Sequence, residues 1–234
     1  MSEDHPPRPQ VASETIERLK RIYNLYITDV VKPTVQEEYQ RRTDYRRGEW
    51  TDRTLRFFYD LGVKRKHRVF TNRRTFKLAD EKLFVRIKKA YGEPPKEFLV
   101  DLCWFDSSVQ QRLFPKMGMA VEVEWDPWAD PESICLPVAV DEDLMKLFYL
   151  RAALKIAILG CTKSGKVLLQ WQDTETLARL VEKYLTDQAK GESILLVFLA
   201  NSDWDVDAGV KGYITGDRTF LELLRYSYVG FKMQ

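Results

Sequence analysis

The segment 118-GMAVEVEWDPW-128 alternates apolar and polar side chains with the two-residue period of a β-strand. In such a strand Glu122 and Glu124 point to one face with Ala120, while the larger apolar side chains point to the other face. The two carboxylates then lie about 7 Å apart along the strand. The same alternation is typical of any strand with one solvated face, so the two glutamates alone do not define a site.

The preceding segment, 97-EFLVDLCWFD-106, is rich in residues that favour strands. Asp101 interrupts its apolar run, and pairing of the two strands would let Asp101 face Glu122 and Glu124. Asp106 is an alternative acid, but it lies at the end of the segment, whereas Asp101 lies within it. Three carboxylates on an apolar sheet repel one another and lose hydration, and a divalent cation relieves both effects. Oxygen ligands of this kind suit Mg²⁺ or Mn²⁺.

The rest of the C-terminal part predicts alternating helices and strands. We expect a helix at 142–154, a strand at 155–160, a helix near 174–188, a strand at 193–200 and a last helix at 217–226. This order predicts an α/β fold with a mixed central β-sheet flanked by helices.

The N-terminal part begins with a polar, proline-rich stretch at 1–12, which predicts a disordered tail. Ser13 is a suitable cap for a helix, because apolar residues recur after it at helical spacing. Pro33 lies near the end of this helix or begins a second helix that reaches about residue 47.

Residues 41–89 leave the secondary structure open, with short strands as one interpretation at 67–78 and 82–88. We expect one domain over 13–234, built from a basic N-terminal segment at 13–90 and a core at 91–234.

The formal net charge of +2 hides an uneven distribution along the 234 residues. Residues 1–100 hold 23 Lys and Arg against 15 Asp and Glu, whereas the remainder holds 14 against 20. Between Lys64 and Lys89 eleven basic residues face two acids, with phenylalanines interleaved, which suits phosphate contacts and base stacking. A solvated face is the other interpretation of such a run. The candidate nucleic-acid-binding residues are Lys64, Arg65, Lys66, Arg68, Arg73 and Arg74.

Other residue counts exclude several classes of protein. Three widely spaced cysteines and no CxxC pair argue against a disulfide scaffold or a structural zinc site, and favour a reducing, cytoplasmic location. Two histidines, His5 and His67, leave no well-placed base for a Ser-His-Asp or Cys-His mechanism. The stretch 160-GCTKSGKV-167 matches GxxxxGK, but Val167 stands where a P-loop needs Ser or Thr. No apolar run is long enough to span a membrane.

Asp101 followed by 122-EVE-124 resembles the PD-(D/E)XK, or restriction-endonuclease-like, nuclease superfamily. The chain resembles most a group of bacterial proteins with an ESEW strand, a DFxKL helix and a KVMI-like strand. The matching stretches here are VEVEW at 121–125, DLMKL at 143–147 and KIAIL at 155–159, and the resemblance covers roughly residues 97–200. Three positions depart from the pattern: Val100 replaces a proline, Val123 a serine and Glu124 the final lysine.

This resemblance implies that Asp101 and Glu122 bind Mg²⁺ or Mn²⁺ and that Glu124 positions or deprotonates the attacking water. It further implies that Lys146 and Lys155 stabilise the phosphate or contact the backbone of the nucleic acid. A carboxylate from the first core helix often assists in this fold, and Glu37 or Glu38 could supply it.

The implied activity is metal-dependent hydrolysis of phosphodiester bonds, most readily in DNA, in a defence or repair role. The alternative is a nuclease fold without catalysis that binds nucleic acid or protein. A homodimer and a complex with a partner protein both remain open.

Overall fold

A computed structural model describes residues 13–41, 47–71, 100–106, 117–125, 144, 146–161, 174–188, 192–200, 208–227 and 232–233. The predicted tail at 1–12, the strand considered at 82–88, and Arg73 and Arg74 lie outside these residues.

One long helical segment opens the fold. It comprises α1 (Ser13–Tyr26), a π-helical turn η1 (Ile27–Val31) and α2 (Lys32–Arg41). Pro33 therefore lies in the first turn of a second helix, which was one of the two interpretations, but this helix ends at Arg41 and not near residue 47. Because proline has no N–H and its ring crowds the carbonyl four residues earlier, the wider π-turn lets the chain continue past Pro33.

A further helix, α3 (Arg47–Lys64), occupies much of the region whose secondary structure the sequence left open, and β1 (Arg68–Thr71) follows it. The strand considered at 67–78 is thus confirmed over its first residues. Leu55 and Phe58 of α3 are fully buried against the sheet.

The strands form one mixed, open sheet in sequence order, β1 to β8. The remaining strands are β2 (Leu102–Phe105), β3 (Met117–Glu124), β4 (Ala152–Cys161), β5 (Ile194–Ala200), β6 (Ala208–Ile214), β7 (Thr219–Ser227) and the two-residue β8 (Lys232–Met233). β3, β4 and β5 run parallel to one another, and every other neighbouring pair is antiparallel. The predicted α/β class with a mixed central sheet is confirmed.

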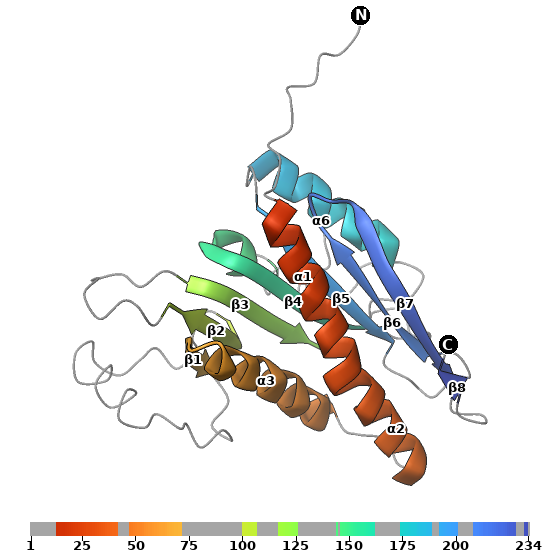
Figure 1. The fold of residues 1–234 in the computed structure, drawn as a ribbon. Coiled ribbons are helices and arrows are strands. Elements are labelled where there is room, and N and C mark those ends of the chain that lie inside the picture. The colour runs from red at the N-terminus through yellow and green to blue at the C-terminus, as the bar shows by residue number, and fades with distance from the viewer. Residues whose placement is uncertain are drawn as a thin grey trace, which may run out of the picture.

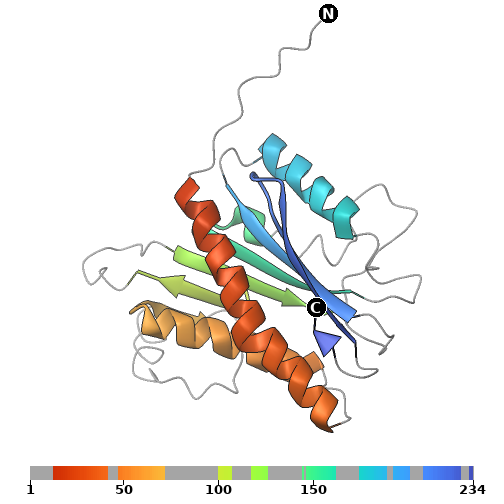
Figure 2. The same cartoon turned by 45° about the vertical axis from the view of Figure 1, so that its right-hand side comes forward.

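Helices cover both faces of this sheet. Figures 1 and 2 show α1, α2 and α3 crossing one face and α6 (Thr174–Gln188) on the other. A first apolar core joins α1, η1 and α3 to strand residues such as Trp104, Val121 and Ile156. A second core joins α6 and the helical residues 144 and 146–149 to the alternate strand positions, which include Cys103, Ala120 and Ala157. The odd and even positions of β3 therefore face different layers.

The last predicted helix, at 217–226, is wrong, because these residues form the turn after β6 and most of β7. Gly216 and Arg218 both have positive φ, at 85° and 57°, and close a tight turn between the two strands. Pairing with β6 outweighs the helical propensity of the Leu-Glu-Leu-Leu stretch at 221–224.

The predicted start of a strand at 155 is also corrected, since β4 begins at Ala152 and Lys155 lies inside it. The helix at 174–188 and the strand at 193–200 match α6 and β5 closely. Within the described residues, no helix is both long and apolar enough to cross a membrane.

Candidate functional site

Asp101 and Glu122 lie opposite each other at the junction of β2 and β3. Leu102 pairs with Val121 in the antiparallel register, so the next position outward places Asp101 across from Glu122. The Asp101 amide donates to Glu122 Oε2 at 2.9 Å, and the Val123 amide donates to Asp101 Oδ2 at 3.0 Å. Each carboxylate thus accepts a main-chain N–H of the opposite strand, which fixes the two side chains beside each other. We call Asp101 and Glu122 the acid pair.

Lys146 covers the acid pair from the helical residues 146–149. Its Nζ lies 3.3 Å from Glu122 Oε1, so a cation and a main-chain amide contact the two oxygens of Glu122. The Glu122 side chain is only 9% exposed, whereas that of Lys146 is 39% exposed. The site therefore lies at the edge of the second core, where a buried carboxylate meets a lysine that solvent reaches.

Glu124 lies two residues beyond Glu122 on the same face of β3 and is partly buried. In the part of the chain that the structure describes, no three His, Cys, Asp or Glu side chains are grouped so as to hold a metal ion. The structure thus brings two of the three predicted acids together. Asp106, the alternative acid, is exposed at the other end of β2.

Cys103 shares the face of the acid pair two residues along β2 from Asp101. Burial raises the pKa of its thiol to about 12. Because the thiolate is the nucleophilic and metal-binding form, Cys103 stays an inert thiol near neutral pH. Cys103 and Cys161 are both free and buried, so the described residues hold no disulfide between them.

Lys155, which the resemblance assigns to the phosphate or to the nucleic-acid backbone, is buried inside β4. It is 1% exposed, pairs with Glu192, and donates to the Phe148 carbonyl oxygen at 3.4 Å. Its neighbour across the parallel pair is Ala120, two residues before Glu122. Lys155 therefore points toward Glu192 on the same face as the acid pair, and its ammonium is already compensated.

Glu37 and Glu38, the candidates for an assisting carboxylate, belong to α2 on the other face of the sheet. Glu37 pairs with Arg53 at 2.5 Å, and Glu38 accepts from Trp50 Nε1 at 3.0 Å. Both contacts fasten α2 to α3. Neither glutamate therefore belongs to the group around Asp101 and Glu122.

The first glycine of the GxxxxGK stretch has a packing role. Gly160 lies inside β4, where an added Cβ would come within 2.7 Å of the Trp125 carbonyl oxygen. Trp125 and Trp104 are both buried, as the alternation predicted, and Trp104 Nε1 donates to the Phe58 carbonyl oxygen at 3.0 Å. The residues that complete the GxxxxGK stretch, 162–167, lie outside the described part.

The predicted nucleic-acid-binding residues Lys64, Arg65, Lys66 and Arg68 lie at the end of α3 and the start of β1. Arg68 pairs with Phe105, whereas Thr71, at the other end of β1, pairs with Leu102 beside Asp101. The basic cluster and the acid pair are therefore at opposite ends of β2, separated by four residues or about 13 Å along the strand.

Sequence reasoning missed the partners that fix these groups. The exchange of main-chain amides follows from the strand register, and the pairing of Lys155 with Glu192 joins residues 37 positions apart. No local pattern signals the second contact.

Comparison of the chain with models of known protein families, with curated proteins and with solved structures finds no match.

Proposed function

We propose that this protein is a Mg²⁺- or Mn²⁺-dependent nuclease with a restriction-endonuclease-like core, which hydrolyses phosphodiester bonds in DNA in a defence or repair role. The observation that carries the proposal is the acid pair: two carboxylates fixed side by side on adjacent strands, with Lys146 over them. The order of elements supports it as well, since the Asp101 strand, the ExE strand, helical residues and β4 follow one another along the resembling region.

The donor set of the acid pair fits a hard divalent cation. Mg²⁺ usually keeps several waters and is held by one or two carboxylates together with substrate phosphates, so two acids suffice. Glu122 Oε1 already contacts the Lys146 ammonium, which a cation in the same place would replace. A bound divalent cation supplies Lewis-acid polarisation of the phosphate and a bound water of lowered pKa.

The residues of the chain have separable roles in this proposal. Asp101 and Glu122 would hold the cation, and the strand register keeps the two residues opposite each other. Lys146, released from Glu122, neutralises negative charge that develops on the phosphate. Glu124, further along the same face, orients the attacking water or accepts its proton.

A second candidate function is a nuclease fold without catalysis that binds nucleic acid or protein. The favouring observation is that each acid already accepts a main-chain amide, and Lys146 neutralises Glu122. Such contacts fit carboxylates that stabilise the sheet and bind no cation.

Cleavage assays separate the two functions. Supercoiled plasmid, linear duplex DNA and single-stranded RNA would be incubated with Mg²⁺, Mn²⁺ or EDTA. We expect cation-dependent nicking of DNA, slowed about 100-fold or more in Asp101→Asn and Glu122→Gln, since metal ions supply several kcal/mol of transition-state stabilisation. Asp106→Asn, the same change at the exposed end of β2, is the matched control and should cleave like the wild type.

Thermal unfolding of each variant shows that a slower rate is not a loss of fold. Equal cleavage by the wild type and Asp101→Asn would assign the activity to a contaminant and contradict the proposal. A wild type that binds DNA but cleaves neither DNA nor RNA with either cation would establish the non-catalytic alternative.

A further inference from the structure

Five cationic side chains lie on α1 and on the C-terminal end of α3, which a groove separates from α1. They are Arg18 and Arg21 on α1, and Lys64, Arg65 and Lys66 at the end of α3. Spacing of three residues places Arg18 and Arg21 on one side of α1, and Leu25, one turn further, lines the same groove as Lys64. We call these five residues the basic surface.

The two helices bring these charges close enough to affect one another. Burial, together with the positive charges of Arg18 and Arg21, lowers the pKa of Arg65. The sequence clusters pointed to residues 64–68, 73 and 74, so α1 adds two cations that the order of residues does not reveal.

Within the described part of the chain, the basic surface has no counter-ions. Among the described residues, no side-chain hydrogen bond or ion pair involves any of the five cations. Lys20, on the same helix, shows the contrast, because it pairs with both Glu17 and Asp217 at 3.3 Å. Like charges that lack counter-ions destabilise the folded state slightly, so their presence indicates an anionic partner.

The helix dipole explains only part of the arrangement. Lysines and arginines at the C-terminal end of α3 are favoured there by the dipole. Arg18 and Arg21 lie before the last turn of α1, whereas the dipole effect is confined to that turn. A structural explanation of Lys64 and Arg65 therefore leaves the two arginines of α1 unexplained.

The basic surface rests on a rigid support. Lys66 adopts a left-handed conformation with φ of 61°, and the main-chain bonds from Lys66 to Val63 and from His67 to Gly62 end α3 there. The His67 ring then stacks on the buried Trp104 at 5.3 Å. A lysine thus occupies a position where glycine is the favoured residue, and its side chain remains exposed.

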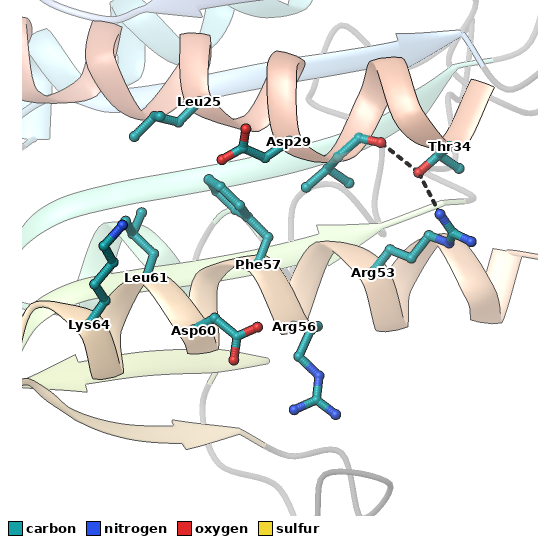
Figure 3. A pocket seen from close by; sticks show the side chains of 10 residues that line it. Leu25, Asp29, Thr34, Arg53, Arg56, Phe57, Asp60, Leu61 and Lys64 are labelled. Atoms are coloured by element: carbon teal, nitrogen blue, oxygen red, sulfur yellow. Dashed lines mark hydrogen bonds between the residues drawn. The ribbon is translucent and has the colours of Figure 1, made fainter. Parts of the chain in front are cut away.

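The groove between α1 and α3 borders the basic surface. Its volume is about 450 Å³, and Figure 3 shows Phe57, Leu61 and Lys64 of α3 pointing across it toward α1. Asp29 and Asp60 line the groove beyond Leu61, so its charge there is mixed. The purely cationic region is therefore the end of the groove nearest Arg21 and Arg65.

We infer that the basic surface binds the sugar–phosphate backbone of duplex nucleic acid and anchors it away from the acid pair. The inference rests on the proposed function for the identity of the polyanion. On each strand of a duplex, phosphates recur about every 3.4 Å of helix axis, so unpaired arginines and lysines at several points match a backbone better than a single small anion.

The position of the surface defines the length of the substrate. Arg68, just beyond the basic surface, pairs with Phe105 about 13 Å along β2 from Asp101, and α3 packs on the face opposite to the acid pair. β1, at the edge of the sheet, lies between them, and Figure 1 shows α3 ending beside it. A polyanion must therefore pass around this edge to reach both places, which requires a duplex longer than a few base pairs.

Binding of a fluorescently labelled DNA duplex, measured by anisotropy in EDTA so that no cleavage interferes, tests the inference. The double variant Arg18→Gln/Arg21→Gln should raise Kd about tenfold or more and lower the slope of log K against log salt by about 1.8. Arg65→Gln should act in the same direction by about half that slope. Lys20→Gln, which removes an already paired charge from α1, is the matched control and should leave Kd within about twofold of the wild type.

Unfolding in urea distinguishes lost contacts from lost fold. The double variant should be as stable as the wild type or slightly more stable, because it removes repulsion from Arg65. Unchanged DNA affinity in the double variant would overturn the inference. An equal loss in Lys20→Gln would also overturn it, by showing an effect of net charge alone. Binding to phosphatidylserine vesicles that depends on Arg18 and Arg21, with DNA affinity unaffected, would assign the surface to membranes and not to nucleic acid.

Cleavage results keep the two proposals separate. If DNA binding depends on Arg18 and Arg21 but no cation supports cleavage, the hydrolytic function fails and the anchoring surface stands. If cleavage depends on Asp101 while the double variant binds DNA like the wild type, only the anchoring surface fails.

Discussion

The two ends of β2 hold charges of opposite sign that the fold treats in opposite ways. At one end, Glu122 is buried and its two oxygens accept from the Asp101 amide and Lys146. At the other end, Arg65 is exposed and lies near two further arginines without a counter-ion among the described residues. Among the residues that the structure describes, the acid pair is compensated and the basic surface is not.

This difference separates stability from binding. Removing a compensated charge leaves its partners unsatisfied, so the free energy of unfolding falls. Removing an uncompensated surface charge relieves repulsion and leaves stability equal or higher, while affinity for an anion falls. The predictions below test this separation, beginning with the largest expected change in stability.

The strongest case of a compensated charge is Lys155, which is 1% exposed and paired with Glu192. Glu192→Ala leaves a buried ammonium without its carboxylate, and we expect unfolding to become easier by about 3 kcal/mol. Lys155→Met removes the charge but keeps most of the buried stem, so it should cost clearly less. Urea unfolding of both variants measures the difference. Equal, small losses would show that Lys155 needs no compensation.

The acid pair should respond in a graded way to two substitutions of one residue. Glu122→Ala removes the acceptor of the Asp101 amide and the partner of Lys146, with an expected loss of about 2 kcal/mol. Glu122→Gln keeps an oxygen for the amide and should lose about half as much. Thermal and urea unfolding at neutral pH give both values. If the two variants are equally stable, the contact between Glu122 and the Asp101 amide contributes nothing to stability. That result would contradict the contrast drawn between the acid pair and the basic surface.

Elements with a strong local sequence pattern were predicted correctly, whereas elements that depend on contacts between distant segments were not. Residues 174–188 and 193–200 have a strong local period, and they were predicted almost to the residue. The stretch at 217–226 has helical propensity but becomes a strand through pairing with β6, which no local pattern shows. α3 was not recognised, because aromatic and charged residues at 47–64 hide its apolar side until the sheet is in place.

The candidate site was also predictable only where local sequence patterns determine it. Alternation in 118–128 placed Glu122 on a defined face, and antiparallel pairing then put Asp101 opposite it. Lys155 was placed on a strand, but its pairing with Glu192 depends on a contact between distant segments. Arg18 and Arg21 were not recognised as part of the basic surface, since only the packing of α1 beside the end of α3 brings them near Arg65.

The support of the basic surface can be tested with two glycines of the same helix. A Cβ at Gly62 would lie 2.6 Å from both Trp104 Nε1 and Val69 Cγ2, and the Trp104 ring is held by its bond to the Phe58 carbonyl oxygen. Gly62→Ala should therefore lower stability by about 2 kcal/mol. At Gly48 a Cβ meets no atom within 4 Å, so Gly48→Ala should raise stability by up to about 1 kcal/mol through helix propensity. Equal effects of the two changes in urea unfolding would contradict the close packing at Gly62.

The variant with the smallest expected change in stability separates stability from DNA binding most clearly. Lys66 has φ of 61°, so Lys66→Gly relieves backbone strain and should raise the free energy of unfolding by about 0.5 to 1 kcal/mol. The same change removes one cation from the basic surface, so the salt slope of DNA binding should fall by about 0.9. Arg218, with φ of 57° in the turn before β7, is a control for DNA affinity alone, because its side chain also pairs with Glu182 at 3.5 Å: Arg218→Gly should leave DNA affinity unchanged. If Lys66→Gly gains stability and binds DNA as tightly as the wild type, Lys66 contributes neither to the stability of the fold nor to DNA binding. The basic surface would then not include Lys66.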